Sequence, residues 1–215
     1  MPIRDAESQP RPRSRIRSLA GVALLCLVAV FSPLAAVADV SPAGIVQAFY
    51  DALLAVMRNG EALGARGRYA QLEPAVVRSF DIAFMTRVAV GPGWAGLSLR
   101  DQQRVTEAFR RYVAAIYAER FQSYRGQRME VLGEQSSPNG RMVTSRIVKA
   151  DGQPVSISYL LRESQGTWRI ADVYFEGSIS EMATRRSEFA AVLRTGGIEG
   201  LIDSLNRKAD NLGAS

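Results

Sequence analysis

The sequence predicts an α+β domain in which helices pack on one face of a twisted four-stranded antiparallel sheet. Apolar residues recur at helical spacing in the first half of the chain, and the period shortens to two between residues 129 and 176. Turn-forming residues interrupt that second region at short intervals, which is typical of an antiparallel meander. Helical spacing then returns, and the order of helices, sheet and helices is typical of α+β folds.

The first 38 residues have the three zones of a cleavable signal peptide. Basic residues from Arg4 to Arg17 precede an uncharged apolar run from Leu19 to Val37, and Ala36-Val37-Ala38 offers small residues to a signal peptidase. The core of the apolar run is shorter than the roughly 20 residues of a spanning helix, which disfavours an uncleaved membrane anchor. We therefore expect cleavage after Ala38, export to the periplasm and one mature domain over residues 39–215.

The predicted mature domain has few groups that could carry chemistry. The only cysteine, Cys26, lies in the signal peptide, and the chain has no His. Catalytic triads, thiolate or His-centred metal sites and an imidazole base are therefore excluded. We expect no metal, no cofactor and no catalytic residue.

The charge of the predicted mature domain is modest. The signal peptide contains five Arg and two acidic residues, so its removal lowers the net charge from +6 to +3. Because no basic run remains, a nucleic-acid partner is not expected. A transient attraction to anionic membrane surfaces remains compatible with this charge.

Capping residues place the helices that precede the sheet. Ser41-Pro42 starts a helix that Asn59-Gly60 ends, and Asp81 caps a short apolar helix. Gly91-Pro92-Gly93 marks a break, after which Ser98 has capping-box spacing and begins the longest helix. We expect helices over residues 42–58, 61–72, 74–79, 82–88 and 98–124.

Alternating residues and tight turns place the four strands. Asp151-Gly152 suits a two-residue hairpin turn in which both residues have positive φ. In the third strand Val155, Ile157, Tyr159 and Leu161 share one face, which we expect to be buried. The strands are expected over residues 129–135, 141–150, 153–163 and 167–176.

The residues after the sheet predict two more helices. Ser178 and Glu181 have capping-box spacing, and Gly196-Gly197 ends the helix that they begin, before a last amphipathic helix. The adjacent Arg185 and Arg186 are expected on a solvated helix face with local ion pairs. A docking site for an acidic partner is the alternative for this pair.

Asp172 and Glu176 are the residues on which an enzyme could depend. They lie four residues apart on the fourth predicted strand, so they are expected to point to the same side. A carboxylate facing an apolar cavity beside a tyrosine can shuttle protons. A structural or solvated role is the expected one, and a small enzyme acting on an apolar substrate stays open as an alternative.

Several segments together resemble the MlaC family, also called toluene-tolerance proteins. The resemblance lies in Phe80-Asp81, 85–91, Trp94, 124–126, 155–161, 168–173, 176–177, 186–189 and 197–208. The segment 178–189 resembles in particular the hopanoid-associated branch, HpnM.

The resemblance implies a periplasmic protein that carries lipid, hopanoid or phospholipid, between the inner and outer membranes. Its implied partners are an inner-membrane transporter and an outer-membrane acceptor, and a cargo-free adaptor of a transporter is an alternative. It also implies an apolar cavity between sheet and helices. We expect this cavity to be lined by Phe80, Met85, Phe109, Val113, Ile116, Val155, Ile157, Tyr159, Leu161, Trp168 and Val173.

Overall fold

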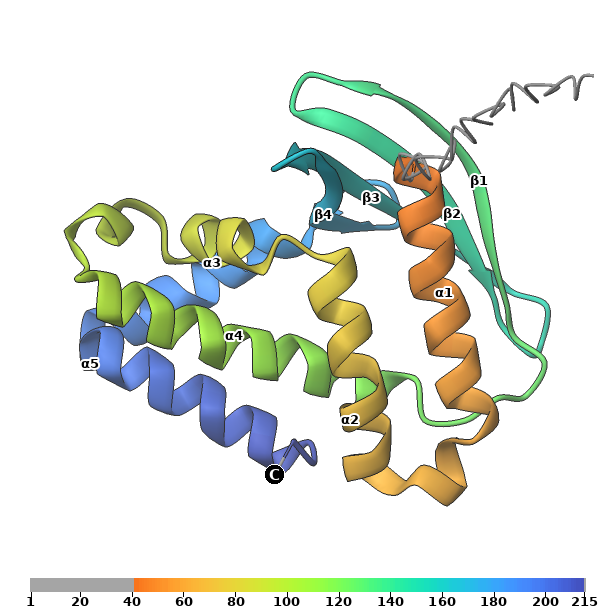
Figure 1. Cartoon of the computed structure of the whole chain (residues 1–215), viewed down its shortest axis with the longest axis horizontal. Coiled ribbons are helices and arrows are strands. Elements are labelled where there is room, and N and C mark those ends of the chain that lie inside the picture. The colour runs from red at the N-terminus through yellow and green to blue at the C-terminus, as the bar shows by residue number, and fades with distance from the viewer. Residues whose placement is uncertain (1–40, 215) are drawn as a thin grey trace, which may run out of the picture. The chain divides into compact units, whose positions relative to one another are not determined.

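The computed structural model describes residues 41–214, and the predicted signal peptide and its cleavage after Ala38 lie outside the described residues. The element order of helices, sheet and helix confirms the predicted α+β class (Figure 1). The elements are α1 (Pro42–Arg58), α2 (Gly60–Ser79), α3 (Ile82–Val90), the 3-10 helix η1 (Gly91–Gly96), α4 (Leu99–Arg120), β1 (Arg128–Ser137), β2 (Gly140–Val148), β3 (Pro154–Ser164), β4 (Thr167–Phe175), β5 (Ile179–Ser180) and α5 (Glu181–Asn211).

The sheet is an antiparallel meander in the order β1-β2-β3-β4-β5. The four predicted strands are all present, and the structure adds β5, a two-residue edge strand that pairs with the end of β4. A strand of two residues has no periodicity that a sequence could reveal. Two register shifts interrupt the ladders, one in β1 between Val131 and Gly133 and one in the β3–β4 pair at Leu160/Leu161.

The buried face of the sheet is the one that alternation predicts in β3. Tyr159 lies opposite Val143 of β2 and Val173 of β4, and all three are buried. Helix α1 lies along this face (Figure 1), where the rings of Tyr50 and Tyr159 meet edge to face at 5.8 Å. The Tyr50 hydroxyl and Ser145 Oγ are 2.6 Å apart, so α1 is also joined to the sheet by a buried hydrogen bond.

The junction between α2 and α3 is fastened to the sheet at Phe80. The Asp81 N–H donates to the Ile170 carbonyl at 2.8 Å, and Phe80 forms a bridge with Ile170. The Phe80 ring contacts Phe49 of α1 at 4.9 Å and Tyr117 of α4 at 5.6 Å. Helices α1 and α4, the α2–α3 junction and the sheet therefore meet at Phe80.

The predicted helix starts are confirmed at three caps and wrong at one. The side chains of Ser41, Asp81 and Ser98 each accept a hydrogen bond from a backbone N–H in the first turn of the following helix. At the last helix the cap is Ser180, whose side chain accepts from the Ala183 N–H, and not Ser178. β5 occupies the residues between, which moves the helix start two residues along the chain.

Several predicted helix boundaries differ from the structure. Helix α2 runs unbroken over Gly60–Ser79 except for a kink at Gly64 (φ 61°), and Pro74 lies inside it and does not open a separate helix. Helix α4 ends at Arg120, four residues before the predicted end.

The helices described here lack the length and the apolar composition of a membrane span; this holds for residues 41–214.

The prediction of a two-residue turn at Asp151-Gly152 is wrong. The β2–β3 connection covers residues 149–153, and only Gly152 in it has positive φ, 85°. The two-residue turn with positive φ at both positions is Gln165-Gly166, between β3 and β4, with φ values of 53° and 72°. A longer loop suits Asp151 because its side chain accepts from the Gln153 N–H at 2.9 Å.

Candidate functional site

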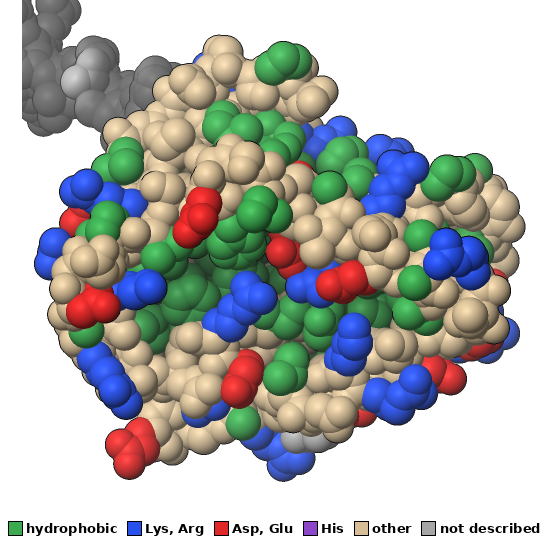
Figure 2. All heavy atoms as spheres, turned by 180° about the vertical axis from the view of Figure 1, so that it is seen from behind, with side chains coloured by type: hydrophobic (Ala, Val, Ile, Leu, Met, Phe, Trp, Pro, Cys, Tyr) green, Lys and Arg blue, Asp and Glu red, His purple; other side chains and the backbone are tan. Residues whose placement is uncertain are grey.

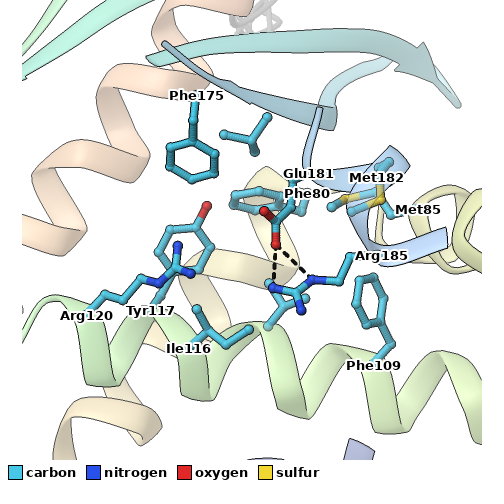
Figure 3. A pocket seen from close by; sticks show the side chains of 12 residues that line it. Phe80, Met85, Phe109, Ile116, Tyr117, Arg120, Phe175, Glu181, Met182 and Arg185 are labelled. Atoms are coloured by element: carbon cyan, nitrogen blue, oxygen red, sulfur yellow. Dashed lines mark hydrogen bonds and ion pairs between the residues drawn. The ribbon is translucent and has the colours of Figure 1, made fainter. Parts of the chain in front are cut away.

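A small apolar space lies between α4, β4 and the start of α5 (Figure 3). Its free volume is about 30 Å³, which is room for little more than a water molecule. The residues around it are Phe80, Met85, Phe109, Val113, Ile116, Tyr117, Arg120, Val173, Phe175, Glu181, Met182 and Arg185.

A second apolar space adjoins the first, between the C-terminal half of α4 and strands β2 to β4. Its free volume is about 220 Å³. It is surrounded by Tyr117, Arg120, Phe121, Ile147, Lys149, Val155, Ile157, Tyr159, Val173 and Phe175. Since Tyr117, Arg120, Val173 and Phe175 belong to both spaces, these four side chains form the wall between them.

Helix and strand geometry explain why these side chains converge. On α4, Phe109, Val113, Ile116 and Tyr117 follow at spacings of three or four residues, or adjacent to one another, and so share one stripe. On β4, Val173 and Phe175 are two apart and share the sheet face that also carries Tyr159 and Ile157. The apolar stripe of α4 and the buried face of the sheet therefore lie on opposite sides of the two spaces.

Tyr117 is the largest side chain in the wall. Its ring contacts Phe49 edge to face at 4.9 Å and stacks on Phe121 at 5.9 Å. Its hydroxyl has no hydrogen-bond partner among residues 41–214, and in Figure 3 it points toward Phe175. Burial raises the pKa of Tyr117 well above its ordinary value, so this hydroxyl is a neutral donor at physiological pH.

A buried ion-pair network forms the α5 side of the first space. The guanidinium of Arg185, which is 7% exposed, donates through Nε to Glu181 at 2.8 Å and through Nη1 to Glu188 at 2.8 Å. Nη1 also donates to the Tyr112 hydroxyl of α4 at 3.2 Å. The prediction of a solvated Arg185-Arg186 face is wrong for Arg185 and holds for the exposed Arg186.

The open edge of the second space carries two cations. Arg120 lies in the last turn of α4 and Lys149 follows β2, and both side chains are exposed. The Arg120 guanidinium lies 6.0 Å from the centre of the Phe175 ring. Seen from behind, the surface is hollowed, with hydrophobic side chains inside the hollow and charged ones around it (Figure 2).

Nine of the eleven predicted cavity residues border one of the two spaces, and Val173 borders both. Leu161 and Trp168 do not. Leu161 is fully buried opposite Ile170, where the Phe80 segment covers the sheet, so it fills the core. Trp168 is half-buried near the start of β4, beyond the register shift. Contact of the nine with a ligand stays a prediction.

Nine further residues border the two spaces but were not predicted to line the cavity: Tyr117, Arg120, Phe121, Ile147, Lys149, Phe175, Glu181, Met182 and Arg185. Tyr117 could have been found, since it belongs to the apolar stripe of α4. Arg120 and Lys149 carry no such signal, because their position depends on how the end of α4 meets the sheet.

Asp172 and Glu176 do not converge on a common site. Asp172 Oδ1 accepts from the Val173 and Met182 N–H groups at 2.7 and 3.1 Å, and Oδ2 accepts from Ser180 Oγ at 2.5 Å. Glu176 lies past the end of β4 with φ of 49° and is exposed. Because β4 ends at Phe175, the strand alternation on which the same-side prediction depended does not extend to Glu176. Asp172 joins β4 to the start of α5.

Comparison with known proteins gives one family and one solved structure. The model of the family described as MlaC protein matches residues 47–207. A phospholipid-binding protein from Ralstonia solanacearum, solved in complex with a phospholipid, has the same fold with a TM-score of 0.70 at 21% sequence identity. The match covers 80% of this chain and 98% of that chain.

Proposed function

The chain belongs to the MlaC family, and from that premise we propose that it is a periplasmic phospholipid-binding protein that carries lipid between the inner and outer membranes. The observation that carries the proposal is the pair of adjoining apolar spaces between the sheet and α4. Support comes also from the Ralstonia solanacearum protein, which shares this fold and holds a phospholipid. An inner-membrane transporter would deliver the lipid and an outer-membrane acceptor would receive it.

The physics of the two spaces suits reversible carriage. Each buried CH₂ group of an acyl chain gains about 0.8 kcal/mol, so two chains are held firmly without any covalent or metal bond. Ligand pockets commonly measure roughly 300–1,000 Å³, and the spaces here measure about 30 and 220 Å³. Loading therefore requires α4 and the sheet to move apart. Release of the lipid lets α4 and the sheet come together again.

Hopanoid is the second candidate cargo. The segment 178–189, which resembles the hopanoid-associated branch, supplies Glu181, Met182 and Arg185 to the first space. A rigid polycyclic lipid would lie along the apolar stripe of α4 in the same way as an acyl chain. We propose no catalytic step for either cargo, since both oxygens of Asp172 are engaged in holding the chain together.

Lipid analysis tests the proposal directly. Protein expressed from the full-length sequence is purified, extracted with organic solvent and examined by mass spectrometry, and after delipidation its uptake of labelled lipid from vesicles is measured. We expect stoichiometric phospholipid or hopanoid in the extract and renewed uptake. Absence of lipid in the extract together with absence of uptake would falsify the proposal.

Matched variants connect the result to the two spaces. Val155→Asp places a charge at the half-buried edge of the second space, and Val155→Trp fills that space with apolar volume. Both are expected to reduce lipid retention, by desolvation cost in one case and by occupied volume in the other. Val77→Asp is the control because Val77 is exposed on α2 and borders neither space.

A further inference from the structure

Arg120 and Lys149 lie where the second apolar space opens to solvent. Lys149 and Arg120 both border the second space and an adjoining surface depression that also includes Gln122 and Met129. Arg120 also borders the first space. The rest of the second space is formed by aromatic and aliphatic side chains. A ligand with an apolar body in this space would therefore place its exposed end between these two side chains.

Neither cation has an acidic partner among residues 41–214. Arg120 contacts the Phe175 ring, and Lys149 contributes its backbone N–H to the loop by donating to the Gln153 carbonyl at 2.9 Å. Eight arginines elsewhere in these residues pair with carboxylates, as Arg146 does with Glu130 at 2.6 Å. The Arg120 guanidinium and the Lys149 ammonium are thus available to an external anion.

The other charges that border the apolar spaces cancel. Glu181 borders the first space, and its carboxylate is engaged by Arg185. Arg120 in the last turn of α4 offsets the negative end of the helix dipole, but Lys149 lies on no helix and has no such role. The opening therefore has an excess of positive charge, and the part of it that Lys149 carries has no role in holding the described fold together.

We propose that Arg120 and Lys149 bind the phosphate of the cargo lipid, which selects phosphate-bearing lipids over neutral ones of the same apolar size. This inference rests on the proposed function. The chains lie between the sheet and α4, and the Tyr117 hydroxyl donates to an ester carbonyl just inside the opening, where no protein acceptor meets it. Arg and Lys hold phosphate oxygens through charge-assisted hydrogen bonds.

Two lipids that differ only in the head group test the proposal. Delipidated protein is offered phosphatidylglycerol or diacylglycerol with identical acyl chains, each in neutral maltoside micelles, and bound lipid is measured by native mass spectrometry. We expect phosphatidylglycerol to be retained about tenfold better than diacylglycerol, the effect of one or two charge-assisted hydrogen bonds. Raising the salt concentration should reduce this ratio.

The double variant R120Q/K149Q isolates the two cations. It should lose the preference for phosphatidylglycerol, so that the two lipids are retained to about the same extent. R194Q/R207Q removes the same charge from exposed positions of α5 that have no ion pair within residues 41–214, and should keep the preference. A Tyr117→Phe variant should weaken binding of both lipids equally, because both contain the ester carbonyls.

The possible results separate failure of the phosphate assignment from failure of the proposed function. If R120Q/K149Q retains the full preference, or loses both lipids equally, the assignment of the phosphate to these side chains is overturned. If the unaltered protein binds neither lipid, the proposed function itself fails. Inorganic phosphate added at the lipid concentration should leave lipid binding unchanged; displacement by it would mean that a free anion, and not a lipid head group, occupies the site.

Discussion

Arg185 is a charged side chain that the fold keeps inside. One helical residue further, Arg186 points about 100° away and is exposed. The difference between these neighbours is a matter of helix phase, which the sequence contains but does not reveal until the packed face of α5 is known. Arg185 joins α5 to α4 through Tyr112 and also closes one side of the first apolar space.

Replacing Arg185 tests its structural role. Arg185→Ala leaves Glu181 without its partner and removes the hydrogen bond to Tyr112. Losing one side of a buried pair costs roughly 3–5 kcal/mol, and we expect about 2 kcal/mol here because both carboxylates are partly solvated. Urea unfolding measures the change. Arg186→Ala is the control, and an equal loss of stability in both variants would contradict the role given to burial.

The raised pKa values of three tyrosines make the free energy of unfolding depend on pH. Burial raises the pKa values of Tyr50, Tyr117 and Tyr159 above the ordinary value. Above about pH 10 these residues ionise in the unfolded chain and stay protonated in the folded one, so the unfolded state binds fewer protons and the free energy of unfolding falls with rising pH. Below pH 9 the three tyrosines should contribute no pH dependence.

Urea midpoints between pH 8 and pH 11 check this prediction, with tyrosinate absorbance followed in parallel. Tyr117→Phe should reduce the slope above pH 10, since its hydroxyl has no partner to lose within the described residues. Tyr124→Phe alters an exposed tyrosine and should leave the slope unchanged. Ordinary titration of Tyr50, Tyr117 and Tyr159 in the native protein would contradict the packing described between the helices and the sheet.

At the scale of the elements, α5 is kinked at a glycine. Gly197 interrupts it with φ of 60° and ψ of −160°, which divides the helix into two segments. Both segments contact α4, the first through Arg185 and Phe189 and the second through Glu199 and Asn206. That combination of dihedral angles is essentially confined to glycine. The helix end predicted at Gly196-Gly197 coincides with this kink, and α5 continues beyond it.

Substituting alanine at Gly197 tests the kink. Nothing lies within 4 Å of an added Cβ at Gly197, so the penalty would be backbone strain alone, about 1–3 kcal/mol. Gly196→Ala is a matched control, because Gly196 has an equally open environment without positive φ and alanine favours a helix by about 1 kcal/mol. Thermal unfolding should show the first variant destabilised and the second unchanged or stabilised; the reverse order would rule out the kink.

The predicted elements differ from the observed ones where local pattern and tertiary pairing conflict. Alternation in β3 placed Tyr159 and Ile157 correctly on the buried face, because one face of the sheet is covered and the other is not. The same alternation could not tell that Leu161 fills the core beneath the Phe80 segment. β5 and the shift beside Leu160 arise from pairing with distant residues, which no local period encodes.

For the whole molecule, the central quantity is the distance between α4 and the sheet. Periodicity identifies the side chains that face inward, yet it gives no volume, because volume depends on how closely two layers approach. The layers approach closely here, leaving about 30 and 220 Å³. We therefore expect the loaded protein to differ from the one described by a separation of α4 from β3 and β4.

The chemistry of the whole chain also limits its function. Family membership and the inert side chains of the apolar spaces both favour holding a lipid over transforming one. Composition indicated this already, since the chain has no His and its one Cys lies in the predicted signal peptide. Which lipid is held depends on Arg120 and Lys149, two residues that only the folded arrangement brings to one opening.

Photo-crosslinking tests most directly whether lipid lies between the sheet and α4. A phospholipid with a diazirine near the end of one acyl chain is bound and irradiated, and the modified residues are found by mass spectrometry of the digested protein. We predict adducts on α4 between Phe109 and Tyr117 and on β4 between Val173 and Phe175. Adducts confined to the outer sheet face, at Leu160 and Ser158, would contradict that location.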